Sequence, residues 1–303
     1  MAYRQLIFIV SIVVLGTACR KNRIPREEGS LRFTESIQVD GLSRTAIIQL
    51  PANYYDGSNF PVIIAMHGGG GTGEQFERST GLTEKAATKG YIVVYPDGVK
   101  SNKGLKVQTW NAGGCCDYAM DQNIDDVKFI SHLIDRIAGK FSINTQRVYA
   151  TGHSNGGMMA YRLACELPSK IAAIAPNGST MMIQPCNPGR PVPILHMHSK
   201  LDERVPYLGG VGTGFTNSNF PSISSVLAVW SVNNGCNPTP AITEKAGYTL
   251  KEWKDCNNAA IHYYLTNDGG HSWPGGKPGW SGGDNPSQSI DANDLMLAFF
   301  SQY

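Results

Sequence analysis

Short apolar runs alternate with helix-length segments along most of the chain. Residues 61–66 and 91–95 are apolar at almost every position, which indicates strands buried on both faces. Residues 125–141 instead place apolar side chains at helical spacing behind two aspartates that can cap a helix. Further strands are predicted at 45–50, 147–151, 171–175, 193–197 and 261–265, and further helices at 76–89, up to about 165, up to about 230 and at 291–303. This order predicts an α/β fold, a doubly wound, mostly parallel sheet in a single domain without a large cap.

The first 18 residues have the composition of an export signal. Arg4 supplies a positive charge, residues 6–15 are apolar apart from one serine, and residues 16–18 are small. Cys19 follows directly, as in bacterial lipoprotein signals, so we expect cleavage before Cys19 and a lipid anchor on it. The expected location is a lipid-anchored periplasmic or cell-surface one, through the outer membrane, with plain secretion as the alternative. Residues 19–30 are polar and are predicted to form a tether, which leaves 31–303 as the folded domain.

Composition narrows the possible partners. Hydrophobic residues make up 41% of the chain and charged residues 17%, which is typical of a folded core rather than of disorder. The 26 basic and 24 acidic residues nearly balance, and no run of five or more basic residues occurs, so no nucleic-acid partner is expected. Nothing in the composition indicates an oligomeric state.

Six cysteines remain beyond the predicted anchor, and an even number in an exported chain favours disulfides. No C-x-x-C pair with matching histidines occurs, so no metal site is expected. Cys236 and Cys256 bracket a short excursion and are the first choice for a bridge. The pairing of the others is left open; these are Cys115, Cys116, Cys165 and Cys186.

A candidate nucleophile lies between a predicted strand and a predicted helix. Residues 152–156 read Gly-His-Ser-Asn-Gly, the G-x-S-x-G pattern in which a cramped strand-to-helix turn projects the serine above the sheet edge. Glycines at 152 and 156 give the close packing that such a turn needs. Ser154 is therefore the predicted nucleophile. The backbone N–H of Asn155, at the start of the helix, is unpaired and can donate to an oxyanion.

A serine hydroxyl needs a base, and the base needs an orienting acid. Asp202 follows the strand at 193–197 after a short loop, and Glu203 is its nearest rival. His271 follows the last predicted strand in a glycine-containing loop that can aim the imidazole across the sheet edge. We therefore predict Asp202 and His271 as acid and base. The other downstream histidines are expected to pack or to form structural hydrogen bonds; these are His196, His198 and His262.

A second oxyanion donor is expected in the loop after the strand at 61–66. His67 is followed there by four glycines, whose backbone amides can approach a carbonyl oxygen without side-chain obstruction. Gly69 is the predicted donor, with Gly70 next. A phosphate-binding loop is the rival interpretation, but no Lys-Ser/Thr follows the glycines. This chemistry requires neither a metal nor an organic cofactor.

Together these motifs resemble a known group of secreted esterases, the feruloyl and acetyl-xylan type (carbohydrate esterase family 1), and polyhydroxybutyrate-depolymerase-like proteins. The resemblance spans about 31–303 and includes HGGGG at 67–71, YPDG at 95–98, WNAGGCC at 110–116, DDV at 125–127, GHSNGG at 152–157, VPY at 205–207 and GHSWPGG at 270–276. It implies an α/β-hydrolase fold and a triad of Ser154, Asp202 and His271. One departure is that relatives usually carry His-Gly-Thr-x-Asp at the acid, whereas residues 198–202 read His-Ser-Lys-Leu-Asp.

The expected function is that of an exported serine carboxylesterase acting on feruloyl or acetyl esters of plant cell-wall polysaccharide, a polymer-linked ester substrate. Polyhydroxyalkanoate depolymerisation is the alternative within the same chemistry. A non-catalytic glycan-binding surface lipoprotein is the alternative of another class. Trp110 and Trp273 are candidates to bind the acyl or sugar group, with ordinary core packing as the competing interpretation.

Overall fold

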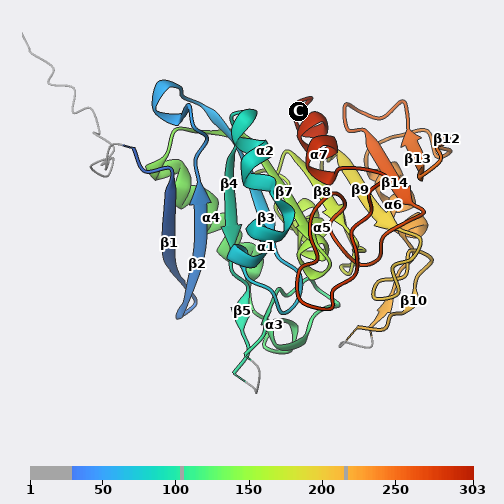
Figure 1. Cartoon of the computed structure of the whole chain (residues 1–303), viewed down its shortest axis with the longest axis horizontal. Helices are drawn as coiled ribbons and strands as arrows, with labels where there is room; N and C mark the ends of the chain where they lie inside the picture. The colour runs from blue at the N-terminus through green and yellow to red at the C-terminus, as the bar shows by residue number, and fades with distance from the viewer. Residues whose placement is uncertain (1–28, 103–105, 215–217) are drawn as a thin grey trace, which may run out of the picture.

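The computed structural model describes residues 29–102, 106–214 and 218–303, so the predicted export signal and Cys19 lie outside the described residues. A ten-stranded sheet runs through the molecule in the order β1-β2-β4-β3-β7-β8-β9-β14-β13-β12 (Figure 1). Its strands are β1 (Arg32–Val39), β2 (Leu42–Gln49), β3 (Phe60–Met66), β4 (Ile92–Pro96), β7 (Ile143–His153), β8 (Ala173–Asn177), β9 (Ile194–Ser199), β12 (Ala241–Glu244), β13 (Tyr248–Trp253) and β14 (Ile261–Thr266). Two short ribbons pair β5 (Val99–Lys100) with β6 (Gln108–Thr109) and β10 (Gly210–Val211) with β11 (Asn219–Phe220).

The six central strands are parallel, and the strands at both edges are antiparallel. β4, β3, β7, β8, β9 and β14 pair in parallel, whereas β1 and β2 on one side and β13 and β12 on the other pair antiparallel. The predicted doubly wound, mostly parallel sheet is confirmed. The pattern did not reveal β1, β12 or β13, because these edge strands carry many exposed polar residues.

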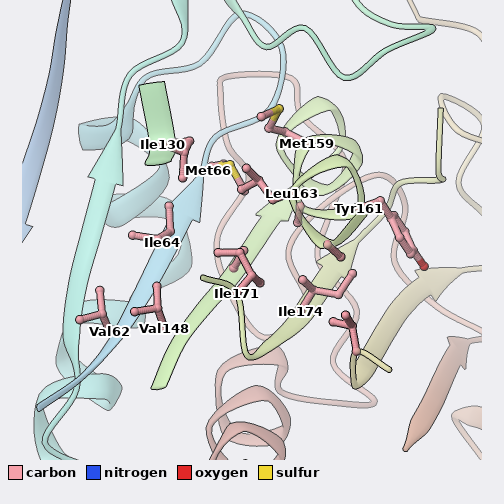
Figure 2. Close-up of a cluster of buried hydrophobic side chains, with 14 of the residues drawn as sticks. Val62, Ile64, Met66, Ile130, Val148, Met159, Tyr161, Leu163, Ile171 and Ile174 are labelled. Carbon is pink, nitrogen blue, oxygen red and sulfur yellow. The ribbon is translucent and has the colours of Figure 1, made fainter. Parts of the chain in front are cut away.

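Helices cover both faces of the sheet (Figure 1). They are α1 (Gly73–Thr80), α2 (Leu82–Thr88), α3 (Asp117–Asp121), α4 (Asp126–Lys140), α5 (Asn155–Glu166), α6 (Ile223–Asn233) and α7 (Ala292–Phe300), with a 3-10 turn at Tyr54–Asp56. Apolar residues of α4, α5 and α6 share one core cluster, and those of α1, α2 and α7 share a second, while Met158 of α5 belongs to a third, smaller cluster. Because strand side chains alternate, Val62, Ile64 and Met66 of β3 enter the first cluster (Figure 2), while Ile63 enters the second.

The helix predicted at 76–89 is in fact two helices. Gly81 ends α1 with a left-handed backbone, φ 61°, and α2 begins at the next residue. Glycine adopts this conformation without the steric cost that a Cβ would bring. The first helix also begins earlier than predicted, at Gly73, where the hydroxyl of Thr72 accepts a hydrogen bond from the N–H of Gln75.

Three disulfides are present among the described residues. Cys236, just after α6, is joined to Cys256, just after β13, which is the pair that the spacing favoured. The other four cysteines, left open above, pair as Cys165 with Cys186 and as Cys115 with its neighbour Cys116. Within the described part of the chain, no helix has the length and apolar character needed to cross a membrane.

Candidate active site

Four predicted site segments meet at one edge of the sheet. β3, β7, β9 and β14 belong to the parallel part of the sheet, so their carboxyl ends lie on the same side. The loops after these ends carry the glycine run, Ser154, Asp202 and His271, respectively. Residues more than a hundred positions apart in sequence are thereby brought together by strand order alone.

Ser154 occupies a strained turn between β7 and α5. Its backbone has φ 56° and ψ −123°, a conformation that a non-glycine residue holds only when the surrounding structure imposes it. The Ser154 N–H donates to the carbonyl oxygen of Asn177 at 3.0 Å. A Cβ on Gly156 would collide with the backbone oxygens of Met66 and His67, and one on Gly152 would meet the Gly156 backbone at 2.5 Å. Both glycines are therefore required for α5 to pack this closely against the sheet.

Asp202 and His271 form a buried pair. Asp202 Oδ2 lies 2.7 Å from His271 Nδ1, and Asp202 Oδ1 accepts the N–H groups of Arg204 and Val205 at 3.0 and 2.9 Å. Burial alone would raise the pKa of Asp202, but its interactions with His271 and His198 hold that pKa well below the ordinary value. Asp202 is thus a fixed carboxylate that orients the imidazole and directs the other ring nitrogen, Nε2, away from itself.

The loops around this pair are tied to each other by hydrogen bonds. Ser199, which stands where relatives usually have glycine, donates its hydroxyl to the carbonyl oxygens of Asp268 and Gly269 at 3.1 and 2.9 Å. The His271 N–H donates to Asp284 Oδ2 at 2.7 Å. The departure at residue 199 therefore links the acid loop to the histidine loop. Glu203, the rival acid, is exposed.

Ser154 and His271 line the same cavity, which has a volume of about 80 Å³. Gly69 and Asn155 also lie on its wall. Among the described residues, no hydrogen bond joins the Ser154 hydroxyl to His271. Two wider surface hollows of about 540 Å³ each lie elsewhere and contain none of Ser154, Asp202 and His271. The cavity at the sheet edge is small, but it is where the predicted chemistry converges.

In the glycine loop, the backbone N–H of Gly69 is more available to a substrate oxygen than that of Gly70. Gly70 N–H donates to the carbonyl oxygen of Gln108 at 2.8 Å, and Gly71 N–H donates to that of Gly68 at 3.0 Å. His67 braces the turn, because its Nδ1 lies 2.7 Å from Gly68 O and its Nε2 accepts the Gly98 N–H at 2.9 Å. With Gly70 engaged, Gly69 is the better candidate donor on the cavity wall.

Trp110 and Trp273 are core residues, which corrects the expectation that they bind substrate. Trp110 is completely buried, its backbone is held by the amide side chain of Asn155, and its indole N–H donates to His67 O at 2.9 Å. Trp273 is 3% exposed, and its indole N–H donates to Asn293 Oδ1 at 3.0 Å. Both indoles bury large apolar surfaces and satisfy their one polar group internally, so neither lines the cavity.

The cavity has a different tryptophan, which sequence reasoning missed. Trp280 is 45% exposed at the cavity, and the guanidinium of Arg204 lies 5.0 Å from the centre of its ring. The apolar part of the wall includes Met158, Val205 and Phe220. Trp280 lies in a glycine- and proline-rich loop without periodicity, and no signal in the sequence places that loop over the nucleophile.

The described residues hold no group of three or more histidine, cysteine, aspartate or glutamate side chains placed to bind a metal ion.

His153, the residue before the nucleophile, also lies on the cavity, with its ring centre 4.4 Å from that of His271. Burial, and after it the neighbouring His271, lowers the pKa of His153 well below the ordinary value. His153 is therefore a neutral neighbour of the predicted base at physiological pH.

Comparison with known proteins gives the family. Residues 38–203 match the family model Esterase, described as "Putative esterase". Feruloyl esterase B of Piromyces equi is 30% identical over 78% of this chain and 44% of its own length. A bifunctional acetylxylan esterase/xylanase of Neocallimastix patriciarum is 30% identical over 77% of this chain and 31% of its own length. The chain thus spans less than half the length of these two relatives.

A solved structure, the acetyl xylan esterase from Aspergillus awamori, superimposes with a TM-score of 0.62 at 15% identity and covers 89% of this chain and 100% of its own. At that identity the similarity shows only the fold, which is that of an α/β-hydrolase, in agreement with the sheet order described above. The family model, in turn, covers more than half of the chain. The protein therefore belongs to the Esterase family.

Proposed function

We propose that this protein is an exported serine carboxylesterase that hydrolyses feruloyl or acetyl esters on plant cell-wall polysaccharide. The observation that carries the proposal is the buried Asp202–His271 pair, 2.7 Å apart, whose imidazole lines the same cavity as Ser154. The names of the two relatives, a feruloyl esterase and an acetylxylan esterase/xylanase, support the choice of ester.

The reaction proceeds by acyl transfer to Ser154. His271 Nε2 takes the hydroxyl proton while Ser154 Oγ attacks the ester carbonyl carbon, and Asp202 stabilises the resulting imidazolium. The bond from that carbon to the alcohol oxygen then breaks, and His271 returns the proton to the leaving alcohol. A water molecule attacks the acyl-enzyme in the same way, which releases the acid and restores the serine.

Two backbone N–H groups are proposed to stabilise the tetrahedral oxyanion. Asn155 is the first residue of α5, so its N–H has no partner within the helix and lies at the positive end of the helix dipole. Gly69 supplies the second donor, since Gly70 is already engaged. Each such donor typically contributes about 3 kcal/mol at the transition state.

The cavity also indicates how the substrate lies. The cavity has an apolar wall for the acyl group, formed by Met158, Val205 and Phe220. Because the cavity is small, it favours a short acyl chain or an acyl group that extends out of it. Trp280 and Arg204 stand at the mouth and are proposed to contact the remainder of the substrate. The substrate contact expected of Trp110 and Trp273 from the sequence is thus proposed for Trp280 and Arg204 instead.

Export is proposed from the first 18 residues together with the three disulfides, which persist in oxidising compartments. Lipid attachment at Cys19 predicts that the full-length protein expressed in a bacterium incorporates labelled palmitate and sediments with membranes. Cys19→Ala should abolish both. Cys19→Ala that is still labelled would contradict the anchor, and a wild-type protein that is soluble and unlabelled would favour plain secretion.

The proposed activity is tested with purified wild type and Ser154→Ala on p-nitrophenyl acetate, methyl ferulate and acetylated xylan. Wild type should turn over at least one wall-type ester, and the variant should lose at least about a thousandfold in kcat, because the residual catalysis comes from binding and the oxyanion hole alone. Equal activity in both proteins would exclude Ser154 as the nucleophile. Clearing of a polyhydroxybutyrate film without xylan ester hydrolysis would instead indicate a depolymerase. Glycan binding without fluorophosphonate labelling would indicate a binding protein.

A further inference from the structure

Two more histidines lie buried behind the carboxylate of Asp202. His198, on β9, places Nε2 3.3 Å from Asp202 Oδ2 and 2.7 Å from the carbonyl oxygen of Val205. Its Nδ1 lies 3.1 Å from Nε2 of His196, two residues earlier on the same strand. Nδ1 of His196 lies 2.8 Å from the hydroxyl of Tyr161 on α5. A continuous chain of contacts therefore leads from the core to the acid.

The direction of these hydrogen bonds follows from their end point. A carbonyl oxygen can only accept, so Nε2 of His198 carries the hydrogen. Nδ1 of His198 then accepts from Nε2 of His196, and Nδ1 of His196 accepts from the hydroxyl of Tyr161. Burial lowers the pKa of His196 and raises that of Tyr161, which keeps both neutral. The chain then ends at the Nε2–H of His198, which donates to Val205 O and lies 3.3 Å from Asp202 Oδ2.

Both carboxylate oxygens of Asp202 lie close to N–H groups. A carboxylate offers about four lone-pair sites. Oδ1 accepts two backbone N–H groups, from Arg204 and Val205, and Oδ2 faces Nδ1 of His271 and Nε2 of His198. The one Nε2–H of His198 is shared: it donates to Val205 O at 2.7 Å and lies 3.3 Å from Asp202 Oδ2. His198 and Asp202 are both buried.

We propose that His198 is a positioning residue: its Nε2–H, shared between Val205 O and Asp202 Oδ2, holds Oδ2 in place for its hydrogen bond to His271 and stabilises the carboxylate while His271 gains and loses its proton. This inference rests on the proposed function, because His198 would act only through Asp202, the proposed acid of the triad. Backbone N–H groups hold the other carboxylate oxygen, so loss of His198 leaves Oδ2 with a single partner. Oδ2 can then shift from the position that aligns His271 with Ser154.

The pH dependence has a defined sign. The titratable groups that face Asp202 are His271 from the loop after β14, His198 from β9 and His153 from β7. A donor to the carboxylate favours the state in which the Asp202–His271 pair has lost a proton. Removal of that donor makes the pair bind a proton more readily, so the acid limb of the kcat/KM profile should move to higher pH.

The test compares amides of different reach at this position. The amide nitrogen of His198→Gln is as many bonds from the backbone as Nε2, whereas that of His198→Asn is one bond shorter and cannot reach Oδ2. On p-nitrophenyl acetate, the Gln variant should keep kcat within about threefold. The Asn variant should lose about 10- to 100-fold in kcat with little change in KM, the range expected for a hydrogen bond to a charged group. Its acid limb should also shift upward.

Tyr263→Phe is the matched control, because Tyr263 packs edge-on against His196 but its hydroxyl has no hydrogen-bond partner among the described residues. The kcat of this variant should equal that of wild type. Equal kcat values and acid limbs in the Gln and Asn variants would overturn the inference. Circular dichroism checks that each variant folds. If the Asn variant does not fold, the Gln variant decides: a loss of more than tenfold in the kcat of His198→Gln overturns the inference, and a kcat close to that of wild type supports it. Failure of the proposed function would instead appear in wild type, as the absence of Ser154-dependent hydrolysis.

Discussion

At the scale of single residues, side chains of the same type have different tasks according to what surrounds them. Trp110 and Trp273 are buried with their indole N–H groups satisfied, whereas Trp280 leaves almost half of its surface exposed beside the candidate nucleophile. An exposed aromatic ring at a cavity mouth is the feature that a sugar or aryl group can stack upon. Exposure, which the sequence does not encode locally, separates the binding candidate from the two core residues.

Trp280→Ala should therefore weaken substrate binding rather than chemistry. An aromatic contact contributes about 0.5–1.5 kcal/mol, so KM for feruloylated or acetylated xylan fragments should rise by roughly two- to tenfold. The kcat on p-nitrophenyl acetate should remain within about twofold, because this small ester does not extend to the mouth. Ile242→Ala, an exposed apolar residue on edge strand β12, serves as the control and should change neither value. An unchanged KM on xylan fragments in Trp280→Ala would remove Trp280 from the substrate site.

At the scale of elements, the contact of α5 with β3 and β7 sets the nucleophile turn. Gly152 and Gly156 leave no room for a Cβ, since each faces backbone atoms that cannot move aside as a side chain could. Residues 152–157 could be assigned to a strand–turn–helix from sequence because each requirement of that turn is local. The break at Gly81 was not foreseen, because residues on both sides of it form helix readily and a single glycine within a helical pattern is often tolerated.

Gly156→Ala should be strongly destabilising. The added methyl group would overlap the backbone oxygens of Met66 and His67, and overpacking of this kind costs about 3 kcal/mol. Gly139→Ala is a matched control on an exposed face of α4, where a Cβ meets nothing within 4 Å. It should stabilise the protein by about 0.5–1 kcal/mol, because alanine loses less backbone entropy in a helix. Urea unfolding of both variants measures the difference, and equal midpoints would contradict the close packing of α5.

At the scale of the whole molecule, several buried histidines make stability depend on pH. Burial is the main cause that lowers the pKa of His67 to about 4 and that of His153 and His196 well below the ordinary value, and it also lowers the pKa of His262. These groups are neutral in the folded protein but gain protons on unfolding at mildly acidic pH. The unfolded state therefore binds more protons in that range, and acid favours it.

The thermal unfolding midpoint should consequently fall as the pH is lowered from about 6.5 toward 4. The direction follows from the sign of proton uptake, because a folded pKa below the unfolded one gives stability that is complete above the unfolded value and is lost below it. Below about pH 4, the carboxylate of Asp202, whose pKa is held low, adds a further loss. Calorimetry across this range measures the effect. A midpoint that stays flat between pH 7 and 5 would contradict the prediction.

By itself, the sequence determined the alternation of strands and helices, the central strands and the glycine-flanked Ser154. These features depend on local periodicity and on turns that only particular residues allow. It also gave Asp202 and His271 as the acid and base candidates, because parallel strands must end at the same edge of a sheet. The tertiary structure alone decided that Gly70 is engaged elsewhere, that Trp280 rather than Trp273 stands at the cavity, and that His198 and His196 lead to the carboxylate. Each of these depends on distances between segments remote in sequence, which the packing of the whole sheet and its helices fixes and no local pattern records.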